Sequence, residues 1–265
     1  CYYDPSQTAG VEMIPDSKLW NFFGSTTFQI NRDWQAYLTG TYSRDETRFI
    51  IQPTPISGAL MYGPNGDIPA TILIPPTSPY YPHDLAAAHG VDGQPLDVNY
   101  RAVAFGNRDS TDINENGQIV AGVKGAWKDW DWDGNFFYGE SRTSERNNNG
   151  FVRYSQVLPL LNSGQINVFG DNTPEALALV DATQFREKTF DAKAKNYGVQ
   201  GKTSGEIWKL PAGSVSLALG GEVRKEELTQ NFNPALNSGD ITGYGGNFLN
   251  IDASRNIWAA FAGAV

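Results

Sequence analysis

The chain has 265 residues, of which 40% are hydrophobic and 18% charged, and its formal net charge is −9. No apolar run approaches the ~20 residues that a membrane-spanning helix needs, which excludes a helical membrane protein. The acidic balance argues against a nucleic-acid-binding protein, because phosphates are bound by basic surfaces. A β-barrel is not excluded, since its strands carry only alternate apolar residues.

The first predicted elements are two strands, residues 20–31 and 34–43, joined by a tight turn at residues 31–33. Trp20, Phe22 and Phe28 alternate with polar residues in the first strand, and Trp34 and Leu38 do so in the second. Because successive side chains of a strand point to opposite faces, this period of two gives one apolar face and one polar face. Such a hairpin fits a soluble sandwich and also fits a membrane barrel.

Further strands with the same alternation are predicted at residues 118–127, 130–138, 196–207 and 214–224, and a last one begins near residue 256. Short turns lie at residues 31–33, near Lys128 and at residues 210–213, whereas long loops are predicted at about 51–96, 141–184 and 225–255. Residues 97–103 are assigned to the strand that follows them or to a hairpin within the first long loop. Short turns at one end and long loops at the other are the layout of outer-membrane barrels, whereas long loops are uncommon in compact soluble domains. The fold prediction is therefore all-β: an antiparallel curved sheet of about seven strands, as in a partial transmembrane barrel.

The alternation also predicts which side chains share a face, because a slip of one residue would place charges such as Lys202 and Arg224 in hydrocarbon. The side predicted to face lipid holds Trp20, Phe22, Phe28, Trp34, Leu38, Trp130, Trp132, Phe136, Val199, Leu217 and Leu219. The side predicted to face the lumen holds Asn21, Ser25, Gln29, Gln35, Thr39, Asp131, Asp133, Asn135, Gln200, Lys202, Glu222 and Arg224.

One hairpin resembles a known family. Residues 198–224 read GVQGKTSGEIWKLPAGSVSLALGGEVR, which resembles the barrel hairpins of TonB-dependent outer-membrane receptors. Residues 75–82 (PPTSPYYP) and 21–24 (NFFG) also look like that family, in a branch with long extracellular loops. The resemblance implies a receptor of the bacterial outer membrane for active uptake of a scarce solute such as a siderophore, cobalamin or a saccharide.

The resemblance also implies partners. A barrel of this type has ~22 strands around a plugged lumen, so residues 1–265 are interpreted as a fragment of one transmembrane barrel domain. The expected partners are outer-membrane lipid, a missing plug domain, the TonB energy complex and a small solute of unknown identity. We read both ends as truncations, and Cys1 is either a free thiol or has lost its disulfide partner with an upstream segment.

Few motifs suggest a chemical site. Asp129, Asp131, Asp133 and Glu140 match the spacing of a calcium loop, but the surrounding residues read as strand, so we interpret them as part of a lumen-facing strand. His83 and His89 do not have a known zinc spacing. No nucleophile motif appears, and the sequence predicts no enzyme activity, cofactor or metal.

Three loop aromatics are candidate substrate contacts: Tyr62, Tyr80 and Tyr81 could stack on a ligand or pack the loop. Two other functions stay open at this point. One is a soluble all-β carbohydrate-active enzyme or binding module with Asp131 and Asp133 in its cleft, and the other is a surface adhesion protein that uses the long loops.

Overall fold

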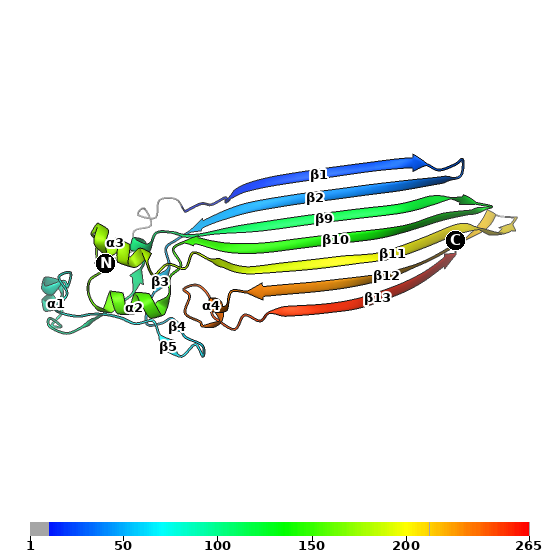
Figure 1. The fold of residues 1–265 in the computed structure, drawn as a ribbon. Coiled ribbons are helices and arrows are strands. Elements are labelled where there is room, and N and C mark those ends of the chain that lie inside the picture. Colours follow the sequence, from blue (N-terminus) through cyan, green and yellow to red (C-terminus); the bar gives the residue numbers. More distant parts are fainter. Residues whose placement is uncertain (1–10, 212, 265) are drawn as a thin grey trace.

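Seven long strands form one open antiparallel sheet in the computed structural model, which describes residues 11–211 and 213–264 (Figure 1). Their order in the sheet is β1-β2-β9-β10-β11-β12-β13, and consecutive long strands along the chain are neighbours throughout. Their bounds are Asp16–Gln29 (β1), Trp34–Ile51 (β2), Arg108–Trp127 (β9), Trp130–Asn149 (β10), Lys188–Leu210 (β11), Gly213–Phe232 (β12) and Ile251–Ala264 (β13). The predicted all-β fold class is confirmed. Cys1 lies outside the described residues.

Residues within the tight turns stabilise them, through a side-chain hydrogen-bond acceptor in one turn and a positive φ angle in another. The Asn31 side-chain oxygen accepts hydrogen bonds from the backbone N–H groups of Asp33 (2.9 Å) and Trp34 (3.0 Å), so it closes the turn between β1 and β2. Between β9 and β10 only two residues turn the chain, and Lys128 there has a φ of 57°. Two-residue hairpin turns need such positive φ values to match the twist of their strands.

The strands continue well beyond the ends that the sequence pattern predicts. β10 runs to Asn149 rather than ending near residue 141, and β12 runs to Phe232 rather than ending near 225. The long connections are therefore residues 52–107, 150–187 and 233–250. Residues 141–149 (SRTSERNNN) lack apolar alternation, and cross-strand hydrogen bonds and ion pairs hold this part of the sheet instead, such as Thr143 Oγ1 to Asn114 Oδ1 at 2.9 Å.

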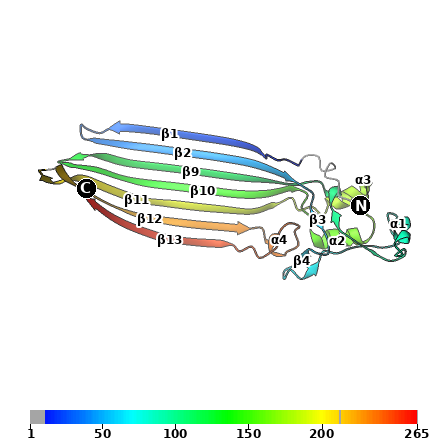
Figure 2. The same ribbon diagram turned by 180° about the vertical axis from the view of Figure 1, so that it is seen from behind.

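The three long connections fold together into one body at the other end of the sheet, which we call the loop unit (Figures 1 and 2). Residues 97–103 belong to it as parts of short strands and a 3-10 helix. Its elements are β3 (Pro55–Ile56), β4 (Met61–Tyr62), β5 (Ile68–Pro69), β6 (Ile72–Ile74), α1 (His83–Ala88), β7 (Leu96–Val98), β8 (Tyr100–Arg101), a 3-10 helix (Val103–Phe105), α2 (Tyr154–Asn162), α3 (Pro174–Asp181) and α4 (Pro234–Asn237).

The loop unit contains the buried core of the molecule. Its larger cluster joins the first two connections, with Ile56, Ile72 and Phe105 from one and Val157 and Leu161 from the other. A smaller cluster consists of Phe151, Phe185, Leu236 and Ile241. Burial of these apolar side chains is what orders the connections. Among the described residues, no helix is both long enough and apolar enough to cross a bilayer.

Candidate functional site

The register of the sheet places the whole predicted apolar set on one face. Residues that lie opposite each other in an antiparallel pair share a face. Leu38 of β2 and Phe136 of β10 are both opposite Ala121 of β9, and Val199 of β11 is opposite Phe136. All seven tryptophans of the chain lie on this side, which we call the tryptophan face: Trp20, Trp34, Trp127, Trp130, Trp132, Trp208 and Trp258.

The predicted polar set lies on the opposite side, which we call the amide face because asparagine and glutamine are frequent there. Asn135 of β10 is opposite Gln200 of β11, which is opposite Glu222 of β12, and the other predicted members follow by the same register. The predicted division of side chains between two faces is therefore confirmed.

An uncharged band crosses the tryptophan face over all seven strands. On β10 it runs from Trp130 to Tyr138, and on β2 from Trp34 to Tyr42. Nine residues of strand extend about 30 Å, which corresponds to a height of about 23 Å at the strand tilt of about 40° that is typical of membrane barrels. The apolar belt of a membrane barrel is ~25 Å tall, so the height of this band matches it.

Aromatic side chains mark both margins of the apolar band. Near the tight turns stand Phe28, Trp34, Trp127, Trp130, Trp132 and Trp208, and near the loop unit stand Trp20, Phe22, Tyr42, Tyr138, Tyr197 and Trp258. Lys128 in the turn lies 4.9 Å from the centre of the Trp127 ring, where a cation is attracted to the ring face. Two aromatic girdles around an apolar band are a property of outer-membrane barrels.

Three tyrosines of the upper margin bond to glutamates just beyond it. The hydroxyl of Tyr42 donates to Glu115 at 3.0 Å, and the hydroxyl of Tyr138 donates to Glu140 at 2.5 Å. The third, Tyr197, donates to Glu227 at 3.2 Å. Each ring thus belongs to the apolar band while its polar tip points toward charged residues, the arrangement expected where hydrocarbon meets water.

Charged side chains fill the tryptophan face directly beyond these tyrosines. Their ion pairs join neighbouring strands: Lys18 with Glu46 (3.5 Å), Arg44 with Glu115 (3.1 Å), and Lys193 with Glu140 (3.4 Å). We call this set the charged rows: Lys18, Arg44, Glu46, Glu115, Glu140, Arg142, Lys193, Lys195, Lys225 and Glu227. Each of six neighbouring strands changes from uncharged to charged on this face, and from β1 to β12 the position of the change shifts stepwise toward the tight turns.

No described element covers the apolar band. Val199 is 55% exposed and Trp258 is 81% exposed, although both are large apolar residues. A soluble sandwich would bury these side chains between two packed sheets. The described residues form one large sheet, and the three small ones consist of two short strands each within the loop unit.

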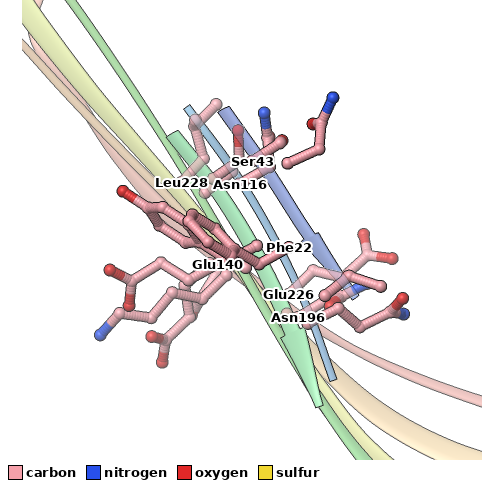
Figure 3. A pocket seen from close by; sticks show the side chains of 18 of the residues that line it. Phe22, Ser43, Asn116, Glu140, Asn196, Glu226 and Leu228 are labelled. Carbon is pink, nitrogen blue, oxygen red and sulfur yellow. The ribbon is translucent and has the colours of Figure 1, made fainter. Parts of the chain in front are cut away.

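The amide face is hollowed across all seven strands, which shows that the sheet curves toward this side. The cavity has a volume of about 930 Å³, and its amide-face lining combines neutral polar residues, among them Asn21, Ser43, Asn116, Ser141 and Asn196, with the apolar side chains of Phe23 and Leu228. Figure 3 shows Ser43, Asn116 and Asn196 on one side of the ribbon. Such side chains offer hydrogen-bond donors and acceptors without net charge.

Ion pairs at the β13 side of this hollow balance its charges. Glu226 receives a hydrogen bond from Arg224 (2.9 Å) and pairs with Arg255 (2.6 Å), and Arg224 also bonds to Glu222. Nearer the tight turns, Tyr37 donates to Asp133 at 2.8 Å, and Asn135 donates to the Tyr37 hydroxyl at 3.0 Å. These contacts brace neighbouring strands across the amide face.

The four residues of the calcium-like pattern do not converge. Asp129 lies in the turn, Asp131 and Asp133 lie on the amide face of β10, and Glu140 lies on the tryptophan face. One ion cannot be bound from both faces of a strand. The described residues contain no group of three or more His, Cys, Asp or Glu side chains arranged to hold a metal.

The three predicted substrate-contact tyrosines lie in the loop unit. The Tyr62 ring stacks on Tyr154 with centroids 4.9 Å apart, and Tyr80 is half-buried. Tyr81 is buried, and its hydroxyl donates to the backbone oxygen of Gln94 at 2.7 Å. Tyr62 and Tyr81 therefore have packing partners within the protein, and a role of the three in solute binding stays a prediction.

Sequence reasoning missed the polar groups that organise the loop unit, because they come from different connections. Asp240 accepts hydrogen bonds from the N–H (2.7 Å) and hydroxyl (2.6 Å) of Ser155. Burial raises the pKa of Tyr100 to about 12, and burial also raises the pKa of Tyr154. The tyrosine–glutamate contacts were missed too, although a tyrosine two positions before a glutamate in residues 138–140 is a visible local signal.

No family model and no curated protein matches the chain. Among solved structures, it is similar to the ferric preacinetobactin receptor of Acinetobacter baumannii, with 10% identity, a TM-score of 0.45, and coverage of 93% of this chain and 27% of that one. The siderophore receptor PiuA of the same organism shares 13% identity with a TM-score of 0.42, over 99% of this chain and 34% of that one. The ferripyoverdine receptor of the Pseudomonas aeruginosa outer membrane shares 10% identity with a TM-score of 0.44, over 94% of this chain and 28% of that one. The chain thus spans about a third or less of each of these proteins.

Proposed function

We propose that the chain is part of a transmembrane β-barrel in a bacterial outer membrane. The observation that carries this proposal is the uncharged band on the tryptophan face, which runs from Trp130 to Tyr138 on β10, with aromatic margins on both sides. The tight turns then lie on the periplasmic side and the loop unit on the outside, because outer-membrane barrels have short periplasmic turns.

We further propose that this barrel belongs to a TonB-dependent receptor and takes part in active uptake of a scarce solute. The hairpin at residues 198–224 supports this through its resemblance to that family. The polar, hollowed amide face suits the wall of a lumen, and the ordered loop unit suits an external binding surface. The solute class is a siderophore, cobalamin or a saccharide, and the partners are the surrounding lipid, a plug domain and the TonB energy complex.

The two alternative functions would require other properties of the tryptophan face, the amide face and the loop unit. A soluble carbohydrate-active module would use Asp131 and Asp133 in a cleft, but it would need a covered tryptophan face, and no described element covers it. A surface adhesion protein would depend on the outside of the loop unit and requires no polar hollow. Neither accounts for the change from an uncharged to a charged surface on six neighbouring strands.

A pair of adjacent substitutions tests the membrane assignment. Leu38 lies in the middle of the apolar band on β2, and Thr39, next to it, lies on the amide face. In lipid vesicles we expect Leu38→Lys to destabilise the inserted protein by ~2–4 kcal/mol, the cost of a cation at the bilayer midplane, and Thr39→Lys to cost far less. The measurement is the urea midpoint of the vesicle-bound protein. Equal midpoints for the two variants would overturn the assignment, because an exposed Leu38 in water tolerates lysine.

A further inference from the structure

The charges of the charged rows are unevenly distributed along the sheet. On β1, β2 and β9, the cations Lys18 and Arg44 are matched by Glu46 and Glu115. β10, β11 and β12 carry four cations but only two carboxylates on this face beside them, those of Glu140 and Glu227, and the Glu115 carboxylate opposite Arg142 on β9 is already paired with Arg44 at 3.1 Å. We call these four the cationic patch: Arg142, Lys193, Lys195 and Lys225.

The two carboxylates cannot neutralise the cationic patch. Glu140 is shared by Arg142 (2.5 Å) and Lys193 (3.4 Å), and Glu227 pairs with Lys225 at 2.7 Å. Lys195 lies opposite Glu140 on one side and Glu227 on the other, and it comes within 4.0 Å of neither carboxylate among the described residues. The nearby carboxylate of Asp191 on β11 is already paired with Lys188 at 3.2 Å.

The pairing of β10 with β11 also places two positive charges of the cationic patch next to each other. Arg142 and Lys193 are directly opposite each other in the β10–β11 pair, and like charges in that position destabilise a sheet. The Arg142 side chain is 58% exposed and that of Lys193 is 36% exposed, so both remain accessible. An anion bound between them would relieve the repulsion.

The position of the cationic patch identifies the anion. Tyr138 and Tyr197 stack directly below it, with ring centroids 6.4 Å apart, and they form the upper margin of the apolar band. If the band lies in hydrocarbon, as proposed above, the patch lies at the depth of the headgroups. Basic clusters at this depth attract anionic lipids by about 1 kcal/mol per lysine or arginine.

We propose that the cationic patch binds the phosphate groups of anionic lipid headgroups in the leaflet nearest the loop unit. This inference rests on the proposed membrane function. It assigns a lipid-binding role to one sector of the barrel surface, β10 to β12, and none to the balanced sector formed by β1, β2 and β9.

The test counts bound phosphatidylglycerol by native mass spectrometry, with the full chain refolded in maltoside micelles. We expect phosphatidylglycerol to be retained over phosphatidylcholine, and Lys193→Gln with Lys195→Gln to weaken retention about fivefold for each lysine removed. Glu140→Gln should strengthen retention, because it releases Arg142 and Lys193 from their shared carboxylate. Arginine at positions 193 and 195 should restore binding.

A matched control removes two lysines from the other face, Lys124→Gln with Lys202→Gln, and should leave retention unchanged. An equal loss in this control, or no change in the Lys193 and Lys195 variant, would overturn the inference. Displacement of the lipid by millimolar inorganic phosphate would also overturn it, by showing a phosphate site without lipid preference. A chain that needs no detergent would instead refute the membrane function itself, which separates the two failures.

Discussion

Asp131 and Glu140 belong to the same strand but face opposite sides of the sheet, and this separation decides how the calcium-like pattern behaves. In a true calcium loop the ligands at these positions surround one ion because the chain curls around it. In β10 the extended backbone keeps them apart, and Asp133 already accepts a hydrogen bond from Tyr37. The acidic residues of this segment therefore act as strand side chains.

We expect calorimetric titration of the chain with calcium at micromolar concentrations to give no saturable heat. Carboxylates on two faces cannot supply the six or more oxygen ligands that calcium takes. Chelation should likewise leave the protein unchanged. The prediction fails if a saturable signal appears and is lost in Asp131→Ala.

Tyr100 is the residue whose ionisation should couple most directly to the folding of the loop unit. Its ring lies 6.2 Å from that of Phe105 inside the larger apolar cluster, and burial raises its pKa from 10.0 to about 12. The unfolded chain releases this proton above pH 10 whereas the folded chain retains it, so the free energy of unfolding falls as the pH rises from 10 toward 12.

We therefore expect the urea midpoint of the protein in micelles to fall between pH 9 and about pH 11, and to fall less steeply in Tyr100→Phe. Other buried tyrosines, such as Tyr244, whose pKa burial also raises, keep part of the slope in the variant. Below pH 9 the two proteins should respond to pH alike. Parallel curves over the whole range would show that Tyr100 does not carry this dependence.

At the scale of the element, α2 depends on a residue from another connection. Its N-cap residue, Arg153, provides no side-chain hydrogen bond, and Asp240 of the third connection supplies a carboxylate to Ser155 in the first turn. A carboxylate there satisfies an unpaired N–H and interacts favourably with the positive end of the helix.

We expect Asp240→Ala to cost about 1 kcal/mol and to loosen α2 and the third connection together. Hydrogen exchange followed by mass spectrometry should show faster exchange in residues 154–162 and 233–250. Asp97→Ala, an exposed aspartate on β7 in the first connection, serves as the control and should change neither segment. Faster exchange confined to residues 233–250 would contradict the capping role.

How far each element could be predicted depends on whether its signal is local. Alternation such as Trp130, Asp131, Trp132, Asp133 predicts a strand and also which face of the sheet each side chain occupies. Successive side chains of a strand point to opposite faces, so the position of one determines the positions of the others. Residues 141–149 carry no such alternation, and their strand depends on partners across the sheet. The loop unit could not be predicted, because its two clusters join different connections: Ile72 packs in one cluster with Leu161, and Ile241 packs in the other with Phe151. Tyr81 was proposed as a contact for a solute, but its burial depends on residues 91 and 94 folding back over it.

At the scale of the whole molecule, the exposed apolar band makes solubility the most direct observable. A contiguous apolar surface over seven strands, together with unpaired edges at β1 and β13, exceeds what soluble monomers tolerate. We expect the refolded chain to require detergent or lipid and to aggregate when the detergent is removed. Size-exclusion chromatography with light scattering measures this, and a monodisperse monomer that melts cooperatively in plain buffer would contradict the membrane assignment.

The order of the sheet has a consequence for how such a wall can close into a ring. Each of the seven long strands is antiparallel to its neighbour, so the first and the last run in the same direction, from the loop unit toward the tight turns. Joining β1 to β13 directly would create a parallel pair, whereas outer-membrane barrels are antiparallel throughout with an even number of strands. An all-antiparallel ring that contains this wall must therefore place an odd number of further strands between its two edges.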